Sequence, residues 1–195
     1  QSADKGTYDV INPATEEMFA EFREMDLSAV KRIIEGSASA QIEWDGLQID
    51  DRIRVIADVA EALRAGCREY AEIISSEMGK PVSEAVAEIE KCAWLCEYYA
   101  ENSKDFLSDK SLNSNALTSF ISYEALGAIF GVMPWNFPFW QVFRFAVPAM
   151  IAGNSVMVKH APNVQASAVA IEKILHGCGV PVDVFRILMI DIDIV

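Results

Sequence analysis

Apolar residues recur every three or four positions through much of the first half of the chain, which predicts a series of amphipathic helices. The clearest stripe begins behind an expected N-cap at Asp50 and contains Ile53, Ile56, Val59 and Leu63. The same spacing predicts helices over residues 28–42, between Gly66 and Gly79, and over residues 83–105. We therefore expect residues 1–117 to form a helical amino-terminal part.

The pattern changes after this helical part. Residues 118–124 alternate polar and apolar side chains, as a half-exposed strand does, and such an edge can pair with another chain. Strands then alternate with helices of ten to fourteen residues: strands over 125–133, 155–160 and 184–190, helices over 139–151 and 164–176. This alternation predicts an α/β fold, with a parallel sheet and right-handed crossovers.

Composition and charge narrow the classes of function. Of the 195 residues, 52% are hydrophobic and 23% are charged, as in ordinary globular proteins. The net charge of −13 argues against a nucleic-acid partner, and it means that an anionic substrate needs a local cation. No run approaches the roughly 20 apolar residues of a membrane span, and no charged-then-apolar leader occurs. We expect a cytoplasmic protein without a membrane partner.

The cysteines allow two interpretations. There are four of them: Cys67, Cys92, Cys96 and Cys178. Cys92 and Cys96 lie four positions apart on one face of an expected helix. A zinc site would need two further ligands, but His160 and His176 belong to other elements. Buried, reduced thiols and no metal are the preferred interpretation, which agrees with a cytoplasmic location.

Residues 131–138, Gly-Val-Met-Pro-Trp-Asn-Phe-Pro, carry the most informative candidate chemistry. Pro134 and Pro138 stiffen a turn from a strand into a helix, and Asn136 lies at the carboxyl end of that strand, where open α/β sheets bind ligands. A carboxamide NH2 on a rigid turn can donate a hydrogen bond to an oxygen that gains negative charge. The alternative is that Asn136 merely caps the following helix.

Several motifs, in order and spacing, closely resemble the aldehyde dehydrogenase superfamily: residues 11–16, 76–81, 134–138, 148–154, 158–159 and 179–185. Residues 133–138 together with 159–163 are most similar to the bacterial succinate-semialdehyde dehydrogenase branch. The resemblance implies a Rossmann-like sheet and the oxidation of succinate semialdehyde to succinate, with NAD or NADP as cofactor. The sequence lacks the Gly-x-Gly-x-x-Gly fingerprint, as that family's Rossmann variant does.

The resemblance also assigns roles to residues. It places Asn136 in the oxyanion hole and the backbone of Met133, Pro134 and Trp135 beside the nicotinamide. Lys159 would bond the adenosine ribose, although a solvated strand end is the alternative. Beside it, the cofactor would meet Ala161 and Pro162. Many NAD-preferring relatives carry a glutamate at the position of Pro162, so its absence leaves NADP open as a cofactor.

Arg144 is the candidate for substrate specificity. It lies eight residues after Asn136 and three after Gln141, so Arg144 and Gln141 are neighbours on one helix. A guanidinium can bind a carboxylate through two parallel hydrogen bonds. The resemblance implies that Arg144 contacts the substrate carboxylate and that Gln141 lies beside it. The alternative is an exposed arginine paired with an acid.

Other parts of the family pattern do not occur in these 195 residues. No cysteine stands in the family's Gly-Gln-x-Cys context, so we expect residues 125–195 to begin a Rossmann-like core that is truncated before the catalytic domain. The segment alone should be inactive. The full-length enzyme should be a homodimer or homotetramer that associates through residues 118–124. A dehydrogenase for uncharged aldehydes and a non-catalytic truncated paralogue that acts through association stay open as alternatives.

Overall fold

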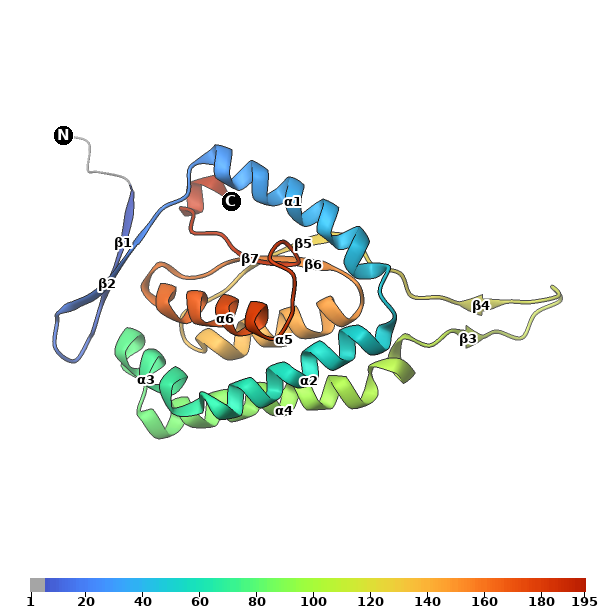
Figure 1. Ribbon diagram of the computed structural model, residues 1–195, viewed down its shortest axis with the longest axis horizontal. Helices are drawn as coiled ribbons and strands as arrows, with labels where there is room; N and C mark the ends of the chain where they lie inside the picture. Colours follow the sequence, from blue (N-terminus) through green and yellow to red (C-terminus); the bar gives the residue numbers. More distant parts are fainter. Residues whose placement is uncertain (1–5) are drawn as a thin grey trace.

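The computed structural model describes residues 6–195 (Figure 1). This part of the chain contains six α-helices and seven short strands. In chain order the elements are β1 (Thr7–Ile11), β2 (Met18–Arg23), α1 (Leu27–Asp45), α2 (Ile49–Ala65), α3 (Cys67–Met78), α4 (Val82–Leu107), β3 (Lys110–Ser111), β4 (Phe120–Ile121), β5 (Ala128–Val132), α5 (Pro138–Ile151), β6 (Ser155–Lys159), η1 (Pro162–Val164), α6 (Gln165–Gly177), β7 (Phe185–Ile187) and η2 (Ile192–Ile194).

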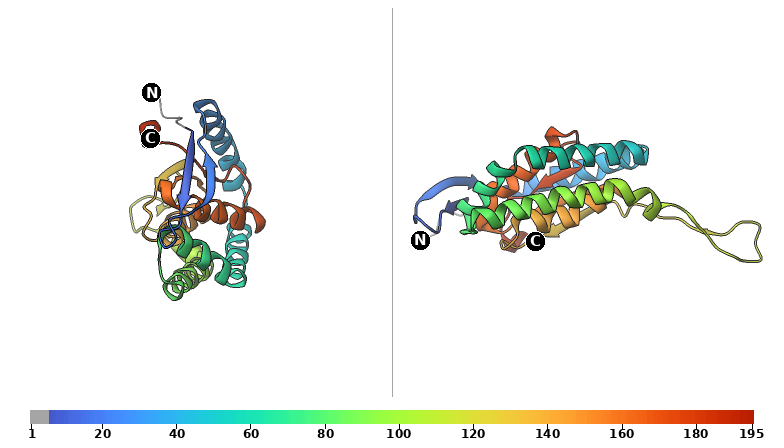
Figure 2. Two further views of the ribbon diagram at one scale, coloured as in Figure 1. Left: turned by 90° about the vertical axis from the view of Figure 1, so that its left-hand side faces the viewer. Right: turned by 90° about the horizontal axis from the view of Figure 1, so that it is seen from below.

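The central sheet is parallel and has the order β5-β6-β7. Helix α1 packs on one face of the sheet and helices α5 and α6 pack on the other, with α2 and α4 outside them (Figures 1 and 2). All five residues of β6 are buried because neighbours cover both faces of this middle strand. Parallel strands that are buried on both faces typically have nearly continuous apolar sequences. The parallel sheet with helices on both faces confirms the expected α/β class.

The core lies between the sheet, the α5–α6 layer and the outer helices. Its largest buried side chains come from every layer and include Trp44, Ile56, Leu63, Ile74, Ile89, Phe139, Phe143, Met150, Ile171, Leu175 and Phe185. The apolar stripe of α2 contributes Ile56, Val59 and Leu63 to it, so the spacing in the sequence does identify an inward face. The core therefore ties the helical first half to the sheet in one hydrophobic cluster.

The helices agree with the periodic pattern, while several local expectations need correction, among them the strands expected over 125–133, 155–160 and 184–190, which are shorter in the structure. The hairpin β1–β2 precedes the helices, so residues 1–117 are not helical throughout. The two strands of this hairpin have five and six residues and are mostly exposed, so the sequence shows no extended apolar periodicity there. Helix α2 has its N-cap at Gln48, with Asp50 in the first turn. The strand expected over 118–124 is shortened to β4, because its partner β3 offers two residues.

Strands β3 and β4 form a narrow antiparallel arm that projects from the body at the end of α4 (Figures 1 and 2). Several large apolar side chains on and beside this arm are exposed: Leu112, Leu117, Phe120, Ile121 and Tyr123. A two-stranded ribbon has no sheet to cover such side chains, and it leaves strand edges available for pairing.

Buried polar side chains hold the carboxyl end of α5. Arg52 of α2 donates hydrogen bonds to the carbonyl of Ile151 at 3.0 Å and to three carbonyls at and just after the end of α1, at 2.8 to 3.2 Å. Trp44 Nε1 donates to the carbonyl of Met150 at 2.7 Å. These donors satisfy carbonyls that a helix end leaves free, and the positive charge suits the negative end of the helix dipole.

We expect Arg52→Met to lower the free energy of unfolding by about 3 kcal/mol, because it leaves several carbonyls without their charged donor. The matched control is Arg54→Met on the same helix, where the guanidinium is exposed and pairs with Asp51. That variant should change stability by about 0.5 kcal/mol or less. Urea unfolding of the chain measures both values. Equal effects of the two substitutions would contradict a stabilising role for the hydrogen bonds of Arg52.

Candidate functional site

The loop between β5 and α5 carries Asn136 at the carboxyl end of a sheet strand. Its first residue is tied to the next strand, because Met133 N donates to the carbonyl of Lys159 at 2.9 Å. The Asn136 side chain is exposed. The residue bonds to the described part of the chain through its backbone carbonyl, which accepts from Lys80 Nζ at 3.0 Å. The carboxamide is thereby left available on a tethered loop.

A buried glutamate from another helix caps α5. The Glu88 Oε1 atom accepts hydrogen bonds from the backbone N–H groups of Phe139 at 2.9 Å and Trp140 at 3.0 Å. Pro138 occupies the first helical position, where the missing N–H costs nothing. The helix N-terminus is thus capped by α4, and the local N-cap residue, Phe137, makes no side-chain cap bond. The alternative in which Asn136 caps this helix is therefore wrong.

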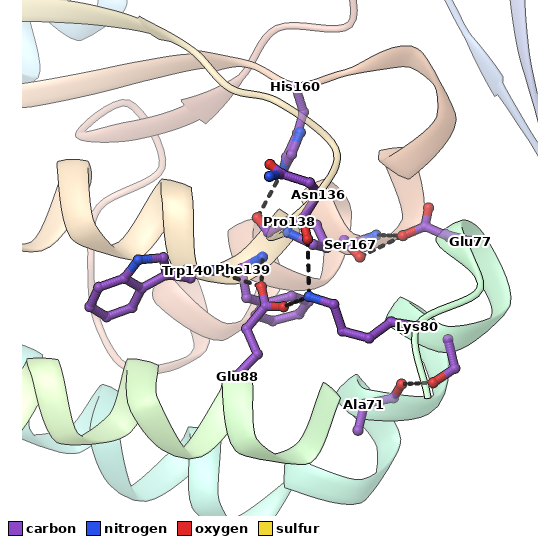
Figure 3. A network of polar contacts seen from close by, with 11 residues as sticks. Ala71, Glu77, Lys80, Glu88, Asn136, Pro138, Phe139, Trp140, His160 and Ser167 are labelled. Carbon is purple, nitrogen blue, oxygen red and sulfur yellow. Dashed lines mark hydrogen bonds and ion pairs between the residues drawn. The ribbon is translucent and has the colours of Figure 1, made fainter. Parts of the chain in front are cut away.

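Lys80 completes the arrangement below the loop (Figure 3). Its ammonium forms an ion pair with Glu88 Oε2, and the two side chains are 7% and 1% exposed. The same ammonium lies 3.9 Å from the centroid of the Phe137 ring. Each charged group has a hydrogen-bonded partner, which a buried ion pair requires. Gly79 ends α3 with a φ of 75°, a left-handed conformation that favours glycine immediately before Lys80.

His160 joins the Asn136 loop to the end of β6. Its Nδ1 atom accepts from the backbone N–H of Ala161 at 2.9 Å, so Nε2 carries the proton and donates to the carbonyl of Pro138 at 2.8 Å. The side chain is fully buried. Burial lowers the pKa of His160 to about 4, since the charged imidazolium loses its solvation. A neutral imidazole therefore connects the two loops.

A second buried glutamate caps α6 in the same manner. The Glu77 carboxylate of α3 accepts hydrogen bonds from the backbone N–H groups of Ala166 and Ser167 and from the Ser167 hydroxyl. Burial raises the pKa of Glu77 to about 7, although these hydrogen bonds favour the charged form. Glu77 and Glu88 thus position the helices that follow the two loops at the carboxyl edge of the sheet.

The two loops also share a surface depression. Trp135 from the first loop and Asn163 from the second line a pocket of about 370 Å³, together with Ile11, Pro13, Glu77 and Met78. Pro134 and Trp135 are exposed, and Met133 is half-buried. The structure therefore brings residues 133–135 and the segment after β6 to one edge of the sheet.

Lys159 is buried at the end of β6, which is not the solvated strand end that stood as its alternative. Lys159 is 5% exposed, and its ammonium donates to the carbonyl of His160 at 3.3 Å. Burial lowers the pKa of Lys159, while the carboxylates of Asp191 and Glu24 oppose this shift. An ammonium has three donors, so the group retains donors for hydroxyl or phosphate oxygens. Ala161 is half-buried beside it, and Pro162 is exposed at the start of η1.

Arg144 and Gln141 are neighbours on α5. The exposed Arg144 guanidinium donates to Gln141 Oε1 at 2.9 Å. None of the ion pairs among residues 6–195 includes Arg144, so its charge is not compensated within this part of the chain. This differs from an exposed helix arginine paired with an acid.

The four cysteines are weakly acidic thiols. Cys92 and Cys96 are buried on one face of α4, and burial raises the pKa of both. Burial also raises the pKa of the half-buried Cys67 and Cys178. At neutral pH these thiols stay protonated and are poor nucleophiles. Within residues 6–195, no group of three or more potential side-chain ligands is arranged to hold a metal ion.

Sequence reasoning missed Lys80, Glu88 and Glu77 as parts of the site. A signal was present, because Glu88 interrupts the inward stripe of α4 between Ala85 and Cys92. A charged residue on an apolar face needs a partner, yet its partners lie 8, 51 and 52 positions away. No local pattern identifies them.

The chain matches one known protein family over nearly its whole length. Residues 1–193 match the model of the aldehyde dehydrogenase family. The chain is 38% identical over 183 residues to the succinate semialdehyde dehydrogenase (NAD(P)+) Sad of Escherichia coli strain K12, covering 94% of this chain and 40% of that protein. It is 46% identical over 138 residues to a Synechocystis sp. protein named "Probable succinate-semialdehyde dehydrogenase (NADP+)", covering 71% of this chain and 30% of that protein.

A solved structure shows the same fold. The succinic semialdehyde dehydrogenase from Streptococcus pyogenes in complex with NADP+ superposes with a TM-score of 0.92 at 30% identity, over 95% of this chain and 41% of that one. The chain thus spans well under half the length of the relatives that it matches.

No helix within residues 6–195 is both long and apolar enough to cross a membrane.

The His160 pKa predicts an acid-dependent loss of stability. Between pH 6.5 and about 4 the unfolded chain binds a proton at His160 that the folded chain does not, so His160 lowers stability as pH falls. Glu77 acts in the opposite direction between pH 4.5 and about 7. The contribution of His160 is therefore measured by comparing the pH dependence of stability in the wild type with that in a variant that lacks His160. We expect wild type to lose about 3 kcal/mol more than His160→Gln between pH 7 and 4, measured by urea unfolding.

The control variant for this experiment is His176→Gln. It removes the other histidine of the chain and keeps the buried one, so the contribution of His160 to the acid dependence should remain. An identical pH dependence in His160→Gln and wild type would contradict a neutral, buried His160.

Proposed function

This chain belongs to the aldehyde dehydrogenase family, and on that premise we propose that it is part of a longer NAD(P)-dependent enzyme that oxidises succinate semialdehyde to succinate. The observation that carries the proposal is the exposed Asn136 carboxamide on a loop tethered by Lys80 and His160. The share of each relative that the chain covers supports the view that other parts of the reaction lie in further residues.

Asn136 is the proposed oxyanion donor. When a nucleophile attacks the aldehyde carbon, negative charge develops on the carbonyl oxygen, and a fixed NH2 group stabilises that charge. The donor must be positioned before the reaction, because reorganising it would consume part of the stabilisation. The loss of one such donor costs about 3 to 4 kcal/mol of the activation free energy. None of the four thiols is activated, so we assign the nucleophile to no cysteine of this chain.

The cofactor proposal rests on Lys159 and the first loop. A buried ammonium with unused donors suits ribose hydroxyls or a phosphate, and the exposed Trp135 lies at the same edge of the sheet. We assign the nicotinamide side to the backbone of Met133, Pro134 and Trp135. Bound NAD or NADP would supply the hydride acceptor. Ala161 and Pro162 would line the ribose, with Pro162 leaving the position free of a carboxylate.

The substrate proposal rests on Arg144. Its guanidinium lacks an acidic partner among the described residues and is oriented by Gln141. In a protein of net charge −13, an anionic substrate meets no general attraction, so a local cation must supply it. A hydrogen bond to a charged group contributes about 1.5 to 3 kcal/mol. We therefore assign the carboxylate of succinate semialdehyde to Arg144, with Gln141 as the residue that orients it.

The proposal also covers the association of subunits and the location of the enzyme in the cell. The β3–β4 arm exposes Leu117, Phe120 and Ile121, which a second subunit could cover by pairing with the strand edge. We accordingly propose a homodimer or homotetramer that uses residues 118–124. Four free cysteines agree with the reducing cytoplasm.

One prediction concerns the cofactor. In the full-length enzyme, Pro162→Glu should raise KM for NADP by roughly tenfold or more relative to NAD, because the new carboxylate repels the 2′-phosphate. Steady-state kinetics with both cofactors measure this ratio. The control Pro181→Glu places the same charge in the exposed α6–β7 connection and should leave the ratio unchanged. Equal effects of Pro162→Glu on both cofactors would show that Pro162 does not face the ribose.

Another prediction concerns the substrate. In the full-length enzyme, Arg144→Leu should lower kcat/KM for succinate semialdehyde by about ten- to a hundredfold and spare butanal, which has no carboxylate. The control Arg68→Leu removes an exposed arginine of α3 that pairs with Glu72, so both substrates should keep their rates. Equal losses on the two aldehydes would favour a dehydrogenase for uncharged aldehydes.

A further inference from the structure

We propose that Lys80 and Glu88 are positioning residues that orient the Asn136 carboxamide for catalysis. The inference rests on the proposed function, because it concerns how the oxyanion donor is held. Lys80 comes from the turn between α3 and α4, and Glu88 comes from α4, so both lie outside the sheet and its loops. Neither touches the exposed face on which the substrate would bind, since both are buried.

The geometry links the pair to the backbone of Asn136 itself. Lys80 Nζ donates to the Asn136 carbonyl at 3.0 Å, and the carboxamide of Asn136 extends on the other side of the loop (Figure 3). Holding the carbonyl restrains the peptide plane that follows Asn136, and this limits the backbone rotations that would redirect the side chain. The remaining side-chain freedom is the rotation about two bonds.

Glu88 fixes the same loop from its other end. Its Oε1 atom binds the N–H groups of Phe139 and Trp140, while its Oε2 atom holds the Lys80 ammonium. One carboxylate therefore ties the first turn of α5 to the group that restrains Asn136. A loop of five residues between β5 and α5 is left with both ends and its middle restrained. Such restraint is what a preorganised oxyanion donor needs.

The effects of substituting Lys80 and Asn136 on kcat should therefore not be additive. In the full-length enzyme with succinate semialdehyde and NADP, Lys80→Met should lower kcat by about 10- to 100-fold and change KM little, because small misplacements of a catalytic group carry such costs. Asn136→Ala should lower kcat by roughly 100- to 1000-fold. In the double variant the loss should equal that of Asn136→Ala alone. A merely structural Lys80 would multiply the two losses instead.

A second variant covers the case in which Lys80→Met fails to fold, since it leaves the Glu88 carboxylate buried without its ion-pair partner. Lys80→Met with Glu88→Gln removes both charges and keeps an acceptor for α5, and it should fold and show the same loss of kcat. Lys91→Met is the matched control, because Lys91 contacts the Trp140 ring of α5 at 3.9 Å without reaching the loop. It should keep the kcat of the wild type.

Amide hydrogen exchange gives a readout that does not depend on turnover. The amides within residues 134–140, which are those of the five residues other than proline, should exchange faster in Lys80→Met and in the neutral double variant, and at the wild-type rate in Asn136→Ala. Multiplicative losses of kcat, or unchanged exchange over residues 134–140, would overturn the role of Lys80. If wild type lacks aldehyde oxidation, the proposed function fails. If wild type is active and Asn136→Ala loses kcat, that function stands whatever Lys80 does.

Discussion

Helix α5 is held at both ends by buried charged side chains from other helices, and the candidate site depends on this restraint. Glu88 accepts from its first N–H groups, and Arg52 donates to the carbonyl of its last residue, Ile151. The signs match the helix dipole, with a negative group at the amino end and a positive group at the carboxyl end. Because α4 and α2 supply these groups, the helical first half of the chain directly positions the loop that begins α5.

Buried carboxyl groups also cap the helix amino ends at the carboxyl edge of the sheet. Helix amino ends commonly bind phosphates, and the sequence lacks the glycine-rich fingerprint that brings a phosphate to such an end. Here the amino ends of α5 and α6 are already occupied by the carboxylates of Glu88 and Glu77. A phosphate at either end would have to compete with a carboxyl group that already accepts these N–H groups.

Buried polar groups around the loops form a connected set with few unused donors or acceptors. The neutral His160 binds one loop to the other, and the Lys80–Glu88 pair binds the first loop to α4. A buried charge without a partner would be costly, so each partner constrains the other and the backbone between them. The exposed groups of the site, Asn136 and Arg144, stand on this buried framework and make few contacts of their own.

The sequence by itself determined the helices and the parallel sheet, because periodicity and proline positions are local properties, whereas the observed ends of the sheet strands differ from the expected ones. It also indicated Asn136, Lys159 and Arg144 through motifs with fixed spacing. Only the tertiary structure showed that Glu88 caps α5 and that Lys80 holds the Asn136 carbonyl, since those partners are 51 to 56 positions apart. Local patterns specify which face of a helix turns inward, whereas the packing of α4 against α5 decides which buried charge meets which backbone group.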